Sequence, residues 1–152
     1  MKPAKILGVI IAVVQLVSVL AFVLSIYTVT SVLQSSMSGE GLAMEVTVDE
    51  STGVGLLQLE LNPSNPGFLD TDLSLELNLL ADGEKIASDS SSVSLSAGAQ
   101  KTLSLNLMVD ADDMERIINQ GLETSMEFTI GLKTLYDMVG ISNTIELQGG
   151  IR

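Results

Sequence analysis

The stretch Leu73-Ser-Leu-Glu-Leu-Asn-Leu79 places a leucine at every second position, with a polar residue between each pair. Because side chains alternate between the two faces of a β-strand, it predicts a strand with one buried and one wet face. The alternation recurs at Met44–Val48, Leu57–Leu61, Val93–Leu95, Leu103–Val109 and Met126–Ile130, and a last strand is expected near Thr144–Ile151. Turn residues such as Asn62-Pro63 and Asp82-Gly83 separate these runs. Seven or eight short strands at such spacing predict an all-β sandwich over residues 42–152.

One segment, Asp110–Gly121, departs from the alternation and predicts a short helix between late strands. Its apolar residues recur at helical spacing, and they are Met114, Ile117 and Ile118. Asp110 is suited to cap the first turn of this helix, and Gly121 is suited to end it.

The acidic residues of this segment also resemble the start of a calcium loop. They are Asp110, Asp112, Asp113 and Glu115. A calcium loop of this kind requires glycine where Arg116 stands, and a bidentate glutamate where Gly121 stands. The start of a helix explains the same acids without an ion, so we expect no metal site and no cofactor.

A long apolar segment near the amino terminus predicts a membrane anchor. No charged residue occurs from Ile6 to Leu33, and this run is longer than the roughly 20 residues that cross a bilayer as a helix. Lys2 and Lys5 precede the run, and the next basic residue is Lys85. The positive-inside rule therefore predicts a cytoplasmic stub at residues 1–5, a single transmembrane helix at 6–33 and an extracytoplasmic remainder. A cleaved signal peptide is the alternative, with Ser36-Met37-Ser38 as its cleavage site, but its apolar region is normally much shorter.

Three polar residues within the apolar run fall on one side of the expected helix: Gln15, Ser18 and Ser25. Small and polar side chains on one face can hold helices together in lipid, so this face could support self-association or contact with a neighbouring membrane protein. Isolated hydroxyl groups are also simply tolerated in such helices.

Residues 34–41 (QSSMSGEG) are small and polar, and they predict a short flexible linker that keeps the outer domain near the bilayer. We expect residues 42–152 to fold without the anchor, because their apolar residues alternate with polar ones.

Composition excludes several classes of function. The chain contains no Cys and no His, which removes disulfides, thiolate and imidazole catalysis, and the usual zinc ligands. The net charge is −12, and leaving out Lys2 and Lys5 gives −14 for the rest, which repels nucleic acid. Aromatic residues make up only 3%, which disfavours stacking sites for sugars or bases. We find no catalytic motif and expect no enzyme.

The order of motifs resembles the water-stress and hypersensitive-response (WHy) domain of the group-two late-embryogenesis-abundant proteins. A strand that ends in Asn62-Pro63 leads to an Asn/Pro/Gly loop, and the closing strand contains Glu146-Leu-Gln-Gly149. The likeness covers about Val46 to Ile151. At the position after Asn62-Pro63, where the family usually has a further Asn, this chain has Ser64. The resemblance implies an immunoglobulin-like or fibronectin-like sandwich with one helix, in which Asn62 and Pro63 mark the fold.

The resemblance also implies a protective, structural or lipid-associated role in stress rather than catalysis. Together with the anchor, it predicts a single-pass protein of the cell membrane that acts on lipids or neighbouring membrane proteins. Two alternatives stay open. A basic leader, an apolar helix and a β-sandwich head also describe a pilin-like or adhesin-like surface subunit, and the chain could be an accessory subunit of a membrane complex.

Overall fold

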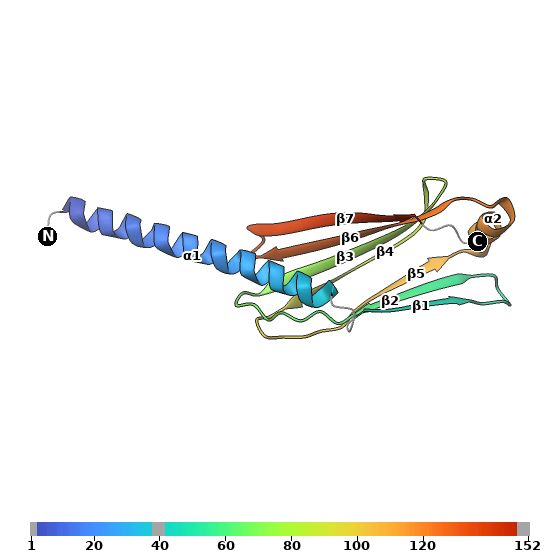
Figure 1. The fold of residues 1–152 in the computed structure, drawn as a ribbon, viewed down its shortest axis with the longest axis horizontal. Helices are drawn as coiled ribbons and strands as arrows, with labels where there is room; N and C mark the ends of the chain where they lie inside the picture. The colour runs from blue at the N-terminus through green and yellow to red at the C-terminus, as the bar shows by residue number, and fades with distance from the viewer. Residues whose placement is uncertain (1–2, 38–41, 149–152) are drawn as a thin grey trace.

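The structure is a computed structural model that describes residues 3–37 and 42–148. Within them the chain forms two helices and seven strands (Figure 1). The elements are α1 (Pro3–Met37), β1 (Leu42–Val48), β2 (Gly55–Leu61), β3 (Thr71–Ala81), β4 (Glu84–Leu95), β5 (Leu103–Val109), α2 (Ala111–Gln120), β6 (Thr124–Thr134) and β7 (Val139–Gln148).

The strands form two antiparallel sheets, with the orders β1-β2-β5 and β4-β3-β6-β7. The sheets face each other (Figure 1), and the predicted all-β sandwich with one short helix is confirmed.

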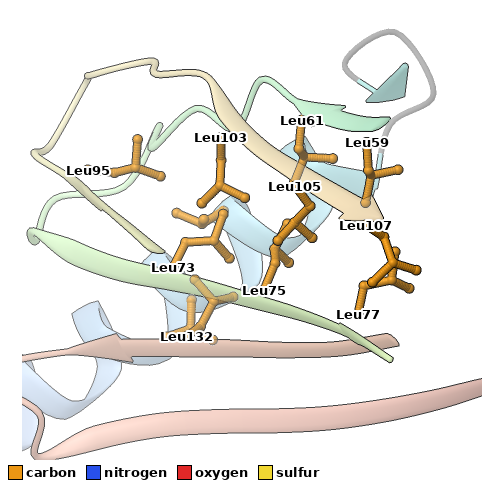
Figure 2. Packing of buried hydrophobic residues seen from close by; sticks show 12 residues of the cluster. Leu59, Leu61, Leu73, Leu75, Leu77, Leu95, Leu103, Leu105, Leu107 and Leu132 are labelled. Atoms are coloured by element: carbon orange, nitrogen blue, oxygen red, sulfur yellow. The ribbon is translucent and has the colours of Figure 1, made fainter. Parts of the chain in front are cut away.

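Alternating leucines from both sheets form the core. Leu73, Leu75 and Leu77 of β3 are buried, while the residues between them are exposed. Leu105 of β5 is fully buried in the same cluster, which Figure 2 shows between the two sheets. The period-two pattern therefore assigned the buried face of each of these strands correctly.

One long side of the sandwich is closed and the other is open. On the closed side β4 lies beside β5, and the backbone N–H of Asn106 donates to Oδ2 of Asp89 at 2.7 Å. On the opposite side β1 and β7 end their sheets and do not pair with each other.

The carboxyl-terminal turns of α1 pack against the sandwich. Thr28, Val29 and Val32 are at most 1% exposed, and the two valines belong to the same core cluster as the sheet leucines. Ser25 and Ser36 extend this buried face by one turn at each end. Within the described residues α1 is also the one helix long and apolar enough to cross a membrane, by length and composition.

This packing corrects the predicted boundaries. The helix predicted for residues 6–33 runs from Pro3 to Met37, so the flexible linker predicted at 34–41 is wrong for residues 34–37. Ser36 donates to the carbonyl oxygen of Val32 at 2.8 Å, and Ser35 donates to that of Ser64 at 2.6 Å. The first bond satisfies Ser36 within the helix and the second ties Ser35 to the β2–β3 loop, and composition alone reveals neither. Residues 38–41 lie outside the described part of the chain.

The short helix α2 forms at the predicted place. Gly121 ends it in the left-handed conformation at φ 64°, and its N–H donates to the carbonyl oxygen of Ile117. The expected side-chain cap is not made: Asp110 contributes its backbone oxygen to Met114, and its carboxylate does not bond the helix start.

Candidate functional site

The residues of the predicted family motif join two loops. Pro63 is fully buried, and its carbonyl oxygen accepts from the backbone N–H of Lys101 at 3.1 Å. The side chain of Asn62 accepts from the hydroxyl of Thr102 at 2.6 Å. Both residues thus connect the β2–β3 loop to the β4–β5 loop, which is a structural role.

Asn65, which sequence reasoning passed over, does more to organise these loops. Its side chain is fully buried, and Nδ2 donates to the carbonyl oxygens of Leu69 and Leu95 at 2.8 and 3.0 Å. Its Oδ1 accepts from the N–H of Gly67 at 3.0 Å. The available signal was the second Asn-Pro pair, since an Asn before a turn commonly bonds the backbone two residues later.

The three polar residues predicted to share a helix-packing face do not share one environment. Gln15 and Ser18 are exposed, and Ser18 donates to the carbonyl oxygen of Val14 within the helix. Ser25 is fully buried where α1 meets the sandwich, and it donates to the carbonyl oxygen of Ala21. Ser25 therefore faces the chain's own domain and is not available to a second helix.

An apolar groove lies between the two sheets on the open side of the sandwich. Its two adjoining hollows, of about 400 and 260 Å³, share Met44, Leu57, Met126 and Leu147. Ser36 of α1 lies at one end of the groove, and Met114 of α2 lies at the other. The helix α1 thus fills one part of the open side, and the groove occupies the part beyond it.

The edges of this groove expose large apolar side chains. On β1, Met44 is 60% and Val46 is 65% exposed, and on β7 Leu147 is 54% exposed. Contiguous apolar surface of this kind marks a site of interaction in a stable protein. The groove is the candidate functional site.

Charged groups lie outside the groove. None of the side chains that line its two hollows is charged. The pKa of Asp49 is lowered from 3.8 to about 2, chiefly by the hydroxyl of Ser51, which donates to the carboxylate at 2.6 Å. Asp49 is fully exposed in the β1–β2 turn, so this shift reflects the local turn.

One acid of the segment at the start of α2, Asp113, forms an ion pair. Arg116 lies 2.9 Å from Oδ1 of Asp113 and 3.6 Å from Oε2 of Glu84. Among residues 3–37 and 42–148, no group of three or more acidic side chains is arranged to hold a metal ion.

Comparisons with known proteins find only distant structural similarity. No family model matches the chain, and no curated protein matches it. A protein from Archaeoglobus fulgidus is similar over 73% of this chain and 95% of its own length, with 13% identity and a TM-score of 0.49. A glycosyl hydrolase family 2 member from Bacteroides cellulosilyticus covers 73% of this chain at 13% identity and a TM-score of 0.43. A beta-glucuronidase from Bacteroides uniformis covers 72% at 14% identity and a TM-score of 0.47. This chain spans only 15% and 13% of those two hydrolases, and the WHy resemblance stays a prediction.

Proposed function

We propose that this chain is a single-pass membrane protein whose non-catalytic β-sandwich stands at the outer face of the membrane and takes the hydrocarbon chain of a lipid into its groove. The observation that carries this proposal is the apolar groove between β1 and β7. Its lining offers apolar area and few polar groups, so it favours an occupant that binds by removing hydrocarbon from water. An elongated groove without charge suits an extended acyl chain better than a polar metabolite.

The anchor supports a position at the membrane. From Ile10 to Tyr27 the large apolar side chains of α1 are mostly exposed, whereas beyond Tyr27 one face of the helix is buried in the sandwich. The uncharged stretch from Ile6 to about residue 26 spans about 30 Å at 1.5 Å per residue, which matches the thickness of a hydrocarbon core. By the positive-inside rule, Lys2 and Lys5 favour a cytoplasmic amino end.

A protective or structural role in stress is the physiological setting that the WHy resemblance favours. A groove that receives acyl chains at the membrane face is compatible with stabilising lipids when a membrane is stressed. None of the lining side chains is ionisable, so the groove itself supplies no acid or base that could activate its serine and threonine hydroxyls, which favours a non-enzymatic role.

Binding of a neutral acyl probe tests this function. The full chain in mild detergent is titrated with a fluorescent monoacylglycerol, alongside the variants Val46→Glu and Thr47→Glu. Val46 is at the groove, while its neighbour Thr47 is exposed and does not line the groove, so it is the matched control. We expect Val46→Glu to lose most of the binding and Thr47→Glu to retain it. Equal binding by both variants, or none by the unaltered chain, would contradict the proposal.

The pilin-like alternative is favoured by one specific feature. In the continuous helix α1, an apolar amino-terminal part projects free and a carboxyl-terminal part packs into a β-sandwich head (Figure 1). Such a stem could pack against copies of itself in a filament. Mass spectrometry of the native amino terminus separates the two candidates, because a processed subunit lacks its basic leader whereas a membrane anchor retains Lys2 and Lys5.

A further inference from the structure

The loops at one end of the sandwich lie beside the point where α1 leaves the domain. Thr71, the first residue of β3, pairs with Leu95 at the end of β4 and with Thr134 at the end of β6. The β2–β3 loop, the β4–β5 loop and the β6–β7 turn therefore meet at this end, and Figure 1 shows them alongside the middle of α1. The β1–β2 and β3–β4 turns and α2 lie at the opposite end.

Apolar and aromatic side chains project from this end. We define the membrane-proximal rim as Tyr27, Phe68, Tyr136 and Met138. Their exposed fractions are 52%, 66%, 98% and 76%. The rings of Tyr27 and Phe68 are 5.7 Å apart, so the helix and the β2–β3 loop contribute to one surface. The chain has five aromatic residues, and three of them are in this rim.

The turn that carries Tyr136 is held in an unfavourable backbone conformation. Leu135, Tyr136 and Asp137 have φ values of 54°, 53° and 67°, and none of them is glycine. Residues with large side chains rarely adopt positive φ, and three in succession require support from the surrounding hairpin. This turn leaves the Tyr136 ring almost wholly in solvent, where folding alone gains nothing from an aromatic side chain.

We propose that the membrane-proximal rim lies in the headgroup region of the outer leaflet and seats the sandwich on the bilayer. This inference rests on the proposed membrane anchoring. If Lys5 lies at the inner surface, Tyr27 is about 33 Å further along the helix at 1.5 Å per residue, which places it at the outer interface. Tyrosine favours this zone because its ring is apolar and its hydroxyl reaches water. The rim thus extends the apolar surface of α1 onto the β2–β3 loop and the β6–β7 turn.

The chemistry of the rim selects zwitterionic rather than anionic lipid. Asp137 lies within the turn itself, and the chain beyond Lys5 carries −14. An anionic surface would repel both, whereas a neutral interface accepts aromatic side chains without that cost. The two anchoring points, the helix and the β6–β7 turn, would together fix the tilt of the sandwich and so the direction in which the groove faces.

The absence of tryptophan from the chain allows a direct test. Three single-tryptophan variants of the full chain are placed in nanodiscs of phosphatidylcholine, with and without a nitroxide at the top of the acyl chain. Tyr136→Trp and Phe68→Trp report on the rim. Ile118→Trp is the control, because Ile118 is 67% exposed on α2 at the far end. An eleven-residue strand separates the two ends by about 35 Å.

We expect the Tyr136→Trp and Phe68→Trp variants to emit at shorter wavelength than Ile118→Trp, and to lose most of their emission to the nitroxide lipid. Emission at 136 that is unaffected by the nitroxide, in protein that co-elutes with the nanodiscs, would overturn the rim while leaving the anchor intact. Emission from Tyr136→Trp that is blue-shifted but not quenched would indicate a protein partner such as a second copy, and would also overturn the rim. Protein that fails to enter the nanodiscs would overturn the anchoring and the rim together.

Discussion

The backbone N–H of Phe68 donates to the hydroxyl of Thr28 at 3.2 Å, which joins α1 to a loop 40 residues later in the chain. Thr28 is fully buried and Phe68 is 66% exposed, so the bond ties an exposed loop to the buried face of the helix. The carboxyl-terminal end of α1 is therefore part of the sandwich, and the domain is held to its helix by packing as well as by the chain connection. Inserting extra residues between positions 38 and 41 would therefore leave the packing of α1 against the sandwich unchanged.

Gly67 is required for this close approach. A Cβ at position 67 would lie 2.6 Å from Oγ1 and 2.8 Å from Cα of Thr28. We expect Gly67→Ala to lower the free energy of unfolding by about 1–3 kcal/mol, because the helix must shift to relieve the overlap. Chemical denaturation of the full chain in detergent measures this. Gly55→Ala is the control, since its Cβ would meet only the flexible side chain of Met114. Equal effects of the two substitutions would argue against tight docking of α1.

The buried face of α1 should contribute to stability while the exposed face should not. Val32 is fully buried and Val23, on the same helix, is 55% exposed. We expect Val32→Ala to lower the free energy of unfolding by about 1–3 kcal/mol through lost burial and a residual cavity, and Val23→Ala to leave it unchanged. The sheet signal in circular dichroism follows the transition. For the same reason we now expect residues 42–152 alone to be destabilised, contrary to the expectation from sequence.

The core leucines should show the large effects typical of full burial. Leu105 of β5 is fully buried, and Met108 on the opposite face of the same strand is 62% exposed. Leu105→Ala should lower the free energy of unfolding by about 2–5 kcal/mol, and Met108→Ala should have little effect. The sandwich assignment would be wrong if Met108→Ala proved the more damaging change.

The β1–β2 turn should contribute to stability only above mildly acidic pH. Hydrogen bonds from Ser51 hold the pKa of Asp49 at about 2, below its ordinary 3.8. A carboxyl group with a lowered folded-state pKa stabilises the folded state above the unfolded-state value, and this contribution is lost as the pH falls from about 4 to about 2. Asp49→Asn should weaken the acid dependence of the unfolding midpoint in this window. If Asp49→Asn leaves the pH dependence of the unfolding midpoint unchanged, the hydrogen bonds from Ser51 to the Asp49 carboxylate do not form in the protein in solution.

The alternating leucines sufficed to predict the strands, because a period of two specifies both the strand and its buried face. Leu73 to Leu79 is the clearest case. The docked end of α1 could not be predicted in the same way. Apolar side chains occur on every side of that helix, so its sequence pattern does not distinguish a face that contacts lipid from a face that contacts protein. Ser25, Thr28 and Ser36 lie on the buried face with Val29 and Val32, but Thr30 and Gln34 are polar and exposed, so polar residues alone do not mark that face.

The groove could not be predicted from the sequence for a related reason. Met44 and Val46 alternate as core residues would, and the pattern predicts burial for both, yet they are exposed. Whether an inward-facing side chain is covered depends on how far the facing edge strand lies from it, and this distance is a property of the assembled sheets. The exposed apolar edges of β1 and β7 thus emerge only when both sheets are in place.

Native mass spectrometry of the full chain, extracted from its own membrane in a mild detergent, tests the central claim most directly. Our account predicts that the unaltered chain retains one lipid molecule in the groove. It also predicts that Val46→Glu releases this lipid and that Thr47→Glu retains it. A chain that carries no lipid, or a lipid retained equally by all three proteins, would contradict it.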